Sequence, residues 1–158
     1  MIHLRRARVD ERQLLEGFQR AAYSRTEAAV GARAIPLEWD YGVILNECEV
    51  WFDEDAEGLN GVLILRVMSD RLFLESIATA PKAAGSGRGR ELLEATFRRA
   101  RELGFDRVGL ITNSLNPALA WYKRVGFAVD HEDVKPGRVV VHMSAHVPEP
   151  GRDPERKA

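Results

Sequence analysis

The sequence contains one cysteine, no long apolar run and almost no net charge. Because Cys48 is the only cysteine, no disulfide can form within the chain, which is typical of a reducing cytoplasm. No apolar run is long enough to span a bilayer, and the N-terminus lacks the apolar segment of a secretory signal, so we expect no membrane contact. A net charge of −1 provides no basic face, so we also expect no nucleic-acid partner.

The remaining composition is typical of one globular domain. The chain has 158 residues, of which 45% are hydrophobic and 30% charged, and this is enough for a core without metal or disulfide. We expect the domain to cover residues 1–147, followed by a flexible, proline-rich and charged tail over residues 148–158. The four histidines show no spacing typical of metal ligands, so no metal site is predicted.

Apolar periodicity predicts the element order β-α-α-β-β-β-α-β-α-β-β. Short turns at residues 53–58 and 69–70 join the three central strands, which indicates antiparallel neighbours. We therefore expect a single-domain α/β (α+β) fold, in which helices flank a mixed, mostly antiparallel sheet. The same patterns predict a loop over residues 24–35, a second helix that begins at Pro36, and a third helix over residues 85–103.

A glycine-rich turn lies between an apolar strand and the third predicted helix. Gly85, Gly87 and Gly89 allow backbone N–H groups to point inward together, and the helix N-terminus adds partial positive charge. Arg88 and Arg90 add full charges, so the turn predicts a phosphate or pyrophosphate site. The alternative is a turn that needs glycine only for its backbone angles. The P-loop and dinucleotide patterns both fail, because no Lys-Ser/Thr pair follows Gly89 and the glycine spacing differs.

Two segments resemble motifs of the GCN5-related N-acetyltransferase (GNAT) family. The segment APKAAGSGRGRELL, residues 80–93, resembles its acetyl-CoA signature, and NPALAWYKRVGF, residues 116–127, resembles its later motif. The predicted element order matches as well, so the resemblance covers nearly the whole chain. It implies a GNAT-like fold and an acetyl-CoA-dependent N-acetyltransferase, with direct transfer to a primary amine of a small molecule or protein in a ternary complex.

The resemblance also implies roles for particular residues. The backbone of Ile77, Ala78 and Thr79 would pair with the pantetheine arm, and the turn would bind the CoA pyrophosphate. Tyr122 would lie near the thioester sulfur, where a phenol can serve as the general acid. The implied cofactor-binding residues are Ile77, Ala78, Thr79, Gly85, Ser86, Gly87, Arg88, Gly89, Arg90 and Asn116. Ala84 departs from the family, which often has Gln or Arg there, and Asn116 is either a CoA ligand or a helix cap.

The amine needs a base, and Glu75 is the best candidate. It is the only ionisable residue in an apolar strand, where a carboxylate is costly unless it is paired or used. A paired structural carboxylate is the alternative role, and Glu38 and Glu132 are the other candidate bases. Cys48 is expected to pack as a small apolar residue rather than to carry an acyl group.

The resemblance also implies that the acceptor lies between the early helices and the late hairpin, which here means residues 23–41 and 131–138. Trp39, Tyr41 and Trp51 are candidates for an apolar or aromatic pocket, with core packing as the alternative. Glu38, Glu132 and Asp133 are candidates for attracting a cationic amine, with solvation as the alternative. Two other functions stay open on the sequence: a non-catalytic acyl-CoA-binding module and a nucleotide-phosphate binder. The sequence also allows a homodimer.

Overall fold

The structure is a computed structural model that describes residues 2–31, 34–83 and 85–150. The elements are β1 (Leu4–Arg6), η1 (Val9–Glu11), α1 (Arg12–Val30), η2 (Ile35–Glu38), α2 (Tyr41–Glu47), β2 (Glu49–Asp55), β3 (Gly58–Val67), β4 (Leu72–Thr79), η3 (Pro81–Ala83), α3 (Arg88–Glu102), β5 (Arg107–Asn113), α4 (Ala118–Arg124), β6 (Ala128–Lys135) and β7 (Arg138–His146). The order of helices and strands confirms the sequence-based prediction, with three short 3-10 turns, η1 to η3, added between them.

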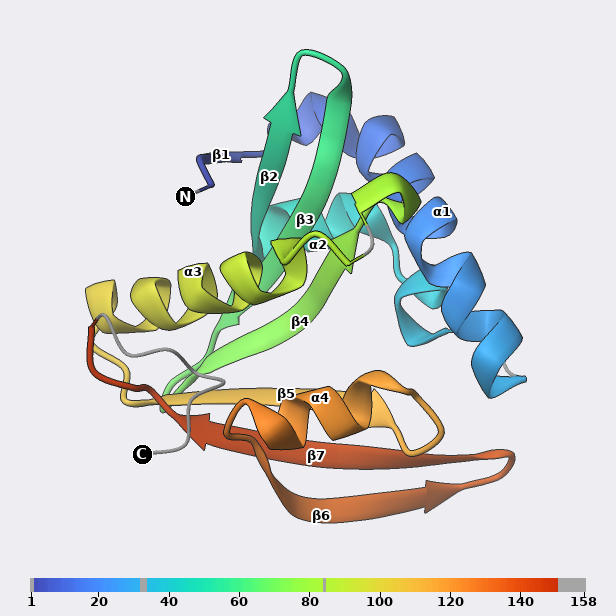
Figure 1. Cartoon of the computed structure of the whole chain (residues 1–158), viewed down its shortest axis with the longest axis vertical. Helices are drawn as coiled ribbons and strands as arrows, with labels where there is room; N and C mark the ends of the chain where they lie inside the picture. Colours follow the sequence, from blue (N-terminus) through green and yellow to red (C-terminus); the bar gives the residue numbers. More distant parts are fainter. Residues whose placement is uncertain (1, 32–33, 84, 151–158) are drawn as a thin grey trace.

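The strands form one seven-stranded sheet in the order β1-β2-β3-β4-β5-β7-β6. Neighbouring strands run antiparallel, except for the parallel pair β4 and β5. Helices cover both faces of this sheet (Figure 1). On one face, Leu92 and Phe97 of α3 pack against Leu63 of β3. On the other face, Leu15 of α1 and Ile44 of α2 pack against the inward side chains of β2 and β3.

The parallel strands β4 and β5 separate soon after they meet. They pair only where Leu72 and Phe73 lie opposite Val108 and Gly109, and Figure 1 shows them diverging beyond that point. The rest of β4 therefore has a strand partner on its β3 side alone, among the residues that the structure describes. This opening in the middle of the sheet is the feature that positions the site.

A β-bulge in β4 contributes to the divergence. Leu74 lies opposite Leu65 of β3, whereas Ser76 lies opposite Ile64, so Glu75 is an extra residue in the ladder. A bulge bends its strand and increases the local twist. The end of β4 is thereby turned away from β5, and the bulged residue lies at the start of the gap.

Three helix boundaries differ from the predictions. The first helix runs on to Val30 through a segment predicted as loop, because Gly31 is its C-terminal cap at φ 72° rather than a loop residue. The second helix begins at Tyr41 instead of Pro36, since the Asp40 side chain accepts hydrogen bonds from the first N–H groups of α2. The third begins at Arg88, because the preceding glycines have positive φ angles that a helix does not allow.

The segment after β7 is attached to the domain at its start. The carbonyl of Pro148 accepts a hydrogen bond from Arg101 of α3 at 2.8 Å, so this part of the predicted tail is held in place. Residues 151–158 lie outside the described residues, and their flexibility stays a prediction. None of the helices in the described parts of the chain combines the length and apolar character needed to cross a membrane.

Candidate active site

A cleft lies between the diverging strands β4 and β5. Its walls come from both helical layers, with α1 and η2 on one side of the sheet and α4 on the other. The lining residues are Tyr23, Ala34, Ile35, Pro36, Trp39, Leu74, Glu75, Ser76, Ile77, Leu110, Ile111, Thr112, Asn113, Asn116 and Tyr122. The cleft therefore joins the two faces of the sheet, so two reactants entering from opposite faces would meet inside it.

Tyr122 projects into this cleft from α4. Its ring packs against Trp121 and Phe127, with ring centroids 5.3 and 5.7 Å away. Its hydroxyl has no hydrogen-bond partner within the described part of the protein. Burial raises the pKa of Tyr122 above the usual value for a phenol, and Tyr23 across the cleft adds to this effect. The phenol is thus protonated at neutral pH, with its proton free to be donated.

A buried polar network forms the α1 side of the cleft. The Tyr23 hydroxyl lies 2.6 Å from the Ser76 hydroxyl, and the Gln19 amide donates to the same Ser76 oxygen at 3.1 Å. Gln19 is fully buried, and its Oε1 lacks a hydrogen-bond partner among the described residues. Burial raises the pKa of Tyr23 to about 12, against the opposing effect of its bond to Ser76. Sequence analysis missed this network because its members lie on two elements that no local pattern connects.

Glu75, the predicted base, lies in the wall of the cleft but is ion-paired. Arg66 of β3 donates to its carboxylate at 2.9 Å and also bonds Glu47 of α2 at 3.0 Å. The Glu75 side chain is 14% exposed, so it retains some access to the cleft. The bulge turns both Glu75 and Ser76 toward the α1 and α2 face. The geometry is thus compatible with a base and with the alternative structural role.

The glycine turn, residues 85–90, leads directly into α3. Gly85 and Gly87 have φ angles of 78° and 82°, and Gly87 is the N-cap of the helix. No heavy atom would lie within 4 Å of a Cβ at Gly85, Gly87 or Gly89, so the turn faces open space among the described residues. The first turn of a 15-residue helix presents backbone N–H groups and the positive end of its dipole there. These features suit an anion.

The Arg88 side chain is less available to a ligand than the sequence suggests. Arg88 donates to Asp53 of β2 at 3.1 Å, and Asp53 is only 4% exposed. Burial raises the pKa of Asp53, and Arg88 opposes that rise. The Arg88 side chain therefore fixes the start of α3 to the sheet. Ala84 lies outside the described residues, so its effect on phosphate binding stays a prediction.

The open edge of β4 runs from the cleft toward the turn. Ile77, Ala78 and Thr79 pair with β3 on one side and have no β5 partner on the other, within the described residues. The carbonyl of Ile77 is 3.4 Å from the Tyr23 hydroxyl, a contact at the limit of a hydrogen bond. An extended ligand can add to such a free strand edge through backbone hydrogen bonds.

Only part of the predicted acceptor wall lies at the cleft. Trp39 lines it, whereas Tyr41 is buried and donates to the Pro36 carbonyl at 2.7 Å. Trp51 lies on the α3 face beside Arg6 and Arg99, because strand alternation points it away from α1. Of the three predicted aromatic residues, only Trp39 lines this cleft. Tyr41 instead borders a second hollow together with Trp39, and Trp51 lies on the other face of the sheet.

The remaining predicted residues divide in the same way. Asn116 lines the cleft, but its side chain accepts a hydrogen bond from the Ala118 N–H at 2.9 Å and so caps α4. Glu38 lies outside the cleft lining and is 3.8 Å from Arg138. Glu132 is in register with Val141, whose side chain is in the α3 core, so it faces away from α1. Burial raises the pKa of Cys48 to about 11, which disfavours a thiolate.

The sequence profile of the acetyltransferase (GNAT) family matches residues 12–127. The chain belongs to the GNAT family. The matched region includes the glycine turn, the open edge of β4 and Tyr122, so the resemblance of the two motifs is confirmed at the level of the family. None of the curated protein sequences compared with the chain matches it.

Solved structures with the same fold include other GNAT acetyltransferases. PaiA N-acetyltransferase from Thermoplasma acidophilum, solved with coenzyme A, superposes with a TM-score of 0.75 at 16% identity, over 92% of this chain and 99% of that one. The ribosomal-protein-S18-alanine N-acetyltransferase from Escherichia coli gives 0.68 at 18% identity, over 97% and 98%. Nourseothricin acetyltransferase gives 0.59 at 27% identity, over 65% of this chain and 66% of that one.

Proposed function

We propose that this protein is an acetyl-CoA-dependent N-acetyltransferase that transfers the acetyl group directly to a primary amine in a ternary complex. The observation that carries the proposal is the position of Tyr122. Its phenol lies in the cleft between β4 and β5 with an uncommitted hydroxyl, among the described residues, in a chain of the GNAT family. An acyl-CoA-binding module without catalysis would have no use for such a proton donor.

The free edge of β4 and the glycine turn fit acetyl-CoA, which supplies the acyl thioester when bound. Backbone N–H groups of Gly85 and of Gly87 through Arg90 would hold the pyrophosphate, supported by the α3 dipole. The predicted ligand Ser86 donates both its N–H and its hydroxyl to the Ala83 carbonyl, at 3.1 and 2.6 Å, so it would shape the turn instead. The backbone of Ile77 through Thr79 would hold the pantetheine arm. Asp53 supports the turn indirectly, because it anchors Arg88 at the start of α3.

Tyr122 would act as general acid toward the leaving thiolate. Burial keeps its phenol protonated at neutral pH, and the proton is not committed to another group within the described residues. Most of the remaining rate gain would come from holding amine and thioester together in the cleft. An acyl-cysteine route finds no support, because Cys48 is buried, absent from the cleft lining and disfavoured as a thiolate.

Glu75 would accept the amine proton through a water molecule. The test uses a matched pair, because Glu75 and Glu47 both bond Arg66 but only Glu75 lines the cleft. We expect Glu75→Gln to lower turnover by about 100-fold or more and to remove one limb of the pH–rate profile. Glu47→Gln should preserve both. An unmoved profile in Glu75→Gln would assign Glu75 a structural role.

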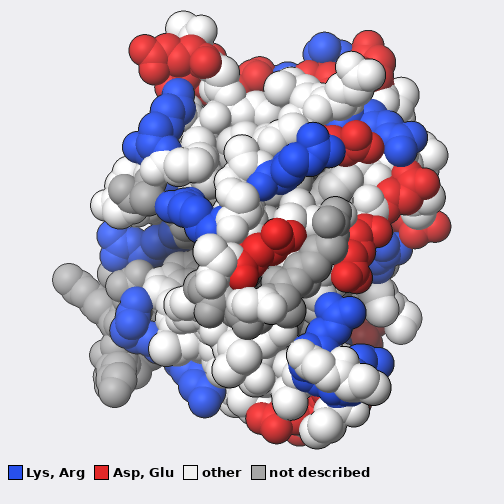
Figure 2. Space-filling view, turned by 90° about the vertical axis from the view of Figure 1, so that its right-hand side faces the viewer, with Lys and Arg blue, Asp and Glu red and all other residues white. Residues whose placement is uncertain are grey.

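We define the acceptor side of the cleft as Tyr23, Ile35, Trp39 and Ser76. Its apolar and aromatic walls with two hydroxyl groups suit an amine carried on an apolar or aromatic group. Figure 2 shows the face that carries α1, where positive and negative side chains alternate without a continuous area of one sign in the described part. A small molecule or a protein amine of mixed charge is compatible with this surface.

The test is turnover of acetyl-CoA with a panel of amines that includes aryl-alkyl amines, aliphatic diamines and peptide N-termini. We expect thiol release that depends on the amine, with a product heavier by one acetyl group. CoA binding without thiol release from any amine would favour the acyl-CoA-binding module. Displacement of CoA by ATP or NAD would favour a nucleotide-phosphate binder, and an acetylated enzyme formed without amine would exclude direct transfer. A cytoplasmic location and a homodimer stay predictions from the sequence.

A further inference from the structure

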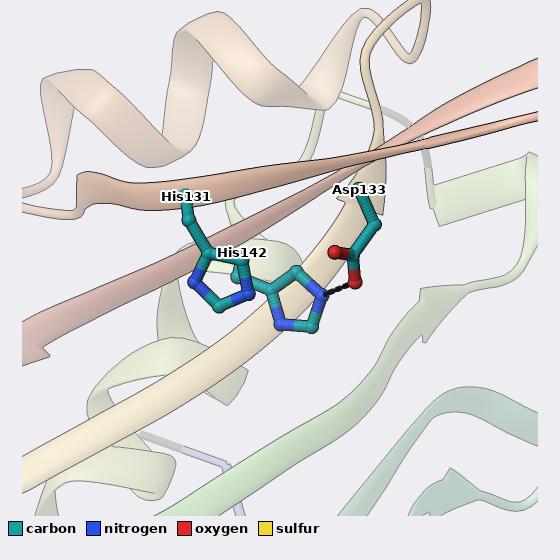
Figure 3. A group of neighbouring side chains, drawn as sticks. All are labelled: His131, Asp133 and His142. Carbon is teal, nitrogen blue, oxygen red and sulfur yellow. Dashed lines mark hydrogen bonds and ion pairs between the residues drawn. The ribbon is translucent and has the colours of Figure 1, made fainter.

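We propose that His131, Asp133 and His142 form a site for a divalent transition-metal ion such as Zn²⁺ on the β6–β7 hairpin. None of the three residues lines the cleft, so Asp133 is not placed there to attract the amine, and the inference does not depend on the proposed function. It rests on three side chains with metal-binding chemistry that strand pairing brings to one face of the hairpin (Figure 3).

The strand register accounts for the cluster. A bulge at Asp130 shifts the pairing of β6 with β7, so Val129 lies opposite Met143 whereas His131 lies opposite His142. Asp133 follows His131 at the two-residue spacing that returns a side chain to the same face. Without the extra residue, His131 would face the other side of the sheet. The spacing of the histidines along the sequence therefore could not reveal this cluster, because strand pairing brings its members together.

The geometry places the donor atoms close together. Nε2 of His142 lies 2.8 Å from an Asp133 carboxylate oxygen, and the His131 and His142 rings stack with centroids 4.1 Å apart. One donor atom from each of these side chains lies within 4.8 Å of the others. Ligand atoms that share one Zn²⁺ at about 2 Å lie roughly 3 Å apart, so modest side-chain rotations would close the site.

The surroundings allow these rotations and leave room for water ligands. His131 and Asp133 are exposed and His142 is partly exposed, at 31%. Two imidazole nitrogens and a carboxylate match the donor set that Zn²⁺ and its neighbours in the first transition row prefer over Mg²⁺. The ion would replace the hydrogen bond between His142 and Asp133.

A bound ion would connect the outermost strand to the rest of the sheet. All residues of β6 are exposed, and β7 is its only strand neighbour among the described residues. Ligands from β6 and β7 on one ion would cross-link the hairpin at His131 and His142. Since the ion binds the folded hairpin in preference to the unfolded chain, it would raise the melting temperature.

Calorimetric titration of untagged protein with Zn²⁺ tests the site, with Mg²⁺ as the reference ion. We expect one Zn²⁺ per chain, bound at least tenfold more tightly than Mg²⁺, and at least tenfold weaker Zn²⁺ binding in His131→Ala and Asp133→Asn. His146→Ala is the matched control, because His146 is an exposed histidine on β7 outside the cluster, and it should bind Zn²⁺ as the unmodified protein does.

A second measurement guards against misfolded variants. Without metal, His131→Ala should melt within a few degrees of the unmodified protein, because the side chain is exposed. Zn²⁺ should raise the melting temperature of the unmodified protein and of His146→Ala, but not that of His131→Ala. Equal Zn²⁺ affinity in the unmodified protein and His131→Ala, or Zn²⁺ binding no tighter than Mg²⁺ binding, would overturn the proposal. Acetyl transfer is not a readout here, so this outcome leaves the proposed function untouched.

Discussion

The glycine turn and the acceptor side of the cleft are built in opposite ways. The turn is one continuous stretch, in which Gly85 and Gly87 adopt positive φ angles and α3 begins at once. The acceptor side combines residues of α1, η2 and β4, which meet only because β4 diverges from β5. A ligand held by backbone N–H groups requires only a local backbone shape, whereas a ligand recognised by side chains requires distant elements to meet.

This difference indicates which half of the site tolerates change. Backbone N–H groups survive most side-chain substitutions, so the turn depends on glycine at a few positions. The acceptor side depends on hydroxyl and aromatic groups such as Tyr23 and Trp39, each of which a substitution can replace. We expect variants of the two regions to separate CoA affinity from amine recognition, and the following predictions test that separation.

The largest expected effect is the loss of turnover in Tyr122→Phe, a change to the residue proposed to act where the two regions meet. Loss of the general acid should lower turnover by about 100- to 10,000-fold, while CoA affinity stays unchanged because the ring and its packing are preserved. Steady-state kinetics and calorimetric CoA binding measure the two quantities. Full turnover in a variant that binds CoA normally would remove Tyr122 from the mechanism.

Gly87→Val should have the next largest effect, on CoA affinity. A β-branched residue at φ 82° costs about 1–3 kcal/mol of strain, and relief of that strain would deform the turn. We expect CoA binding to weaken about tenfold or more. Gly104→Val is the matched control, since Gly104 has φ 81° at the opposite end of α3, so it should lose similar stability and keep its CoA affinity. Unchanged CoA affinity in Gly87→Val would refute the pyrophosphate assignment.

Tyr23→Phe should affect the acceptor alone. The change removes the hydroxyl that bonds Ser76 in the cleft wall, so the KM for the amine should rise by about two- to tenfold while CoA affinity is preserved. Ser24→Ala is the control, because the neighbouring Ser24 hydroxyl bonds the Ala21 carbonyl on the exposed side of α1. Equal shifts in amine KM and CoA affinity would show that the two regions are not separable.

The smallest effect on activity is expected from Glu11→Gln, which should change only the stability of the fold. Arg5 bonds the Glu11 carboxylate at 2.8 Å and lowers the pKa of Glu11 to about 2, against an ordinary value of 4.5. A depressed carboxylate pKa stabilises the fold fully above pH 4.5, and this contribution is lost as the pH falls toward 2. Thermal melts at pH 7 and pH 3 should therefore show the larger penalty for Glu11→Gln at pH 7.

The control for Glu11→Gln is Glu54→Gln. Glu54 is the other carboxylate that bonds Arg5, and its side chain is exposed. This variant should lose less stability at pH 7, because exposed ion pairs contribute little. Both variants should bind CoA normally, since neither residue lines the cleft or belongs to the glycine turn. A pH-independent penalty for Glu11→Gln would contradict the assigned pKa.

Much of the fold follows from local pattern. Leu92, Phe97 and Ala100 recur on one face of α3, and their periodicity is visible before any partner is known. Gly104 ends α3 with the positive φ that its position predicts. The same kind of reasoning failed at residues 24–30, which continue α1 without an apolar stripe, because tertiary placement and the cap at Gly31 extend the helix beyond its periodic part.

The glycine turn and the packing face of each helix are properties of short segments, because φ angles and helical periodicity depend on residues close in the chain. The cleft wall and the His131–His142 pair, in contrast, do not follow from any short segment. Each depends on a bulge, at Glu75 in one case and at Asp130 in the other, and one extra residue changes which side chains face each other across a ladder. Strand register is set by the packing of the whole sheet, so these groups meet only in the folded protein.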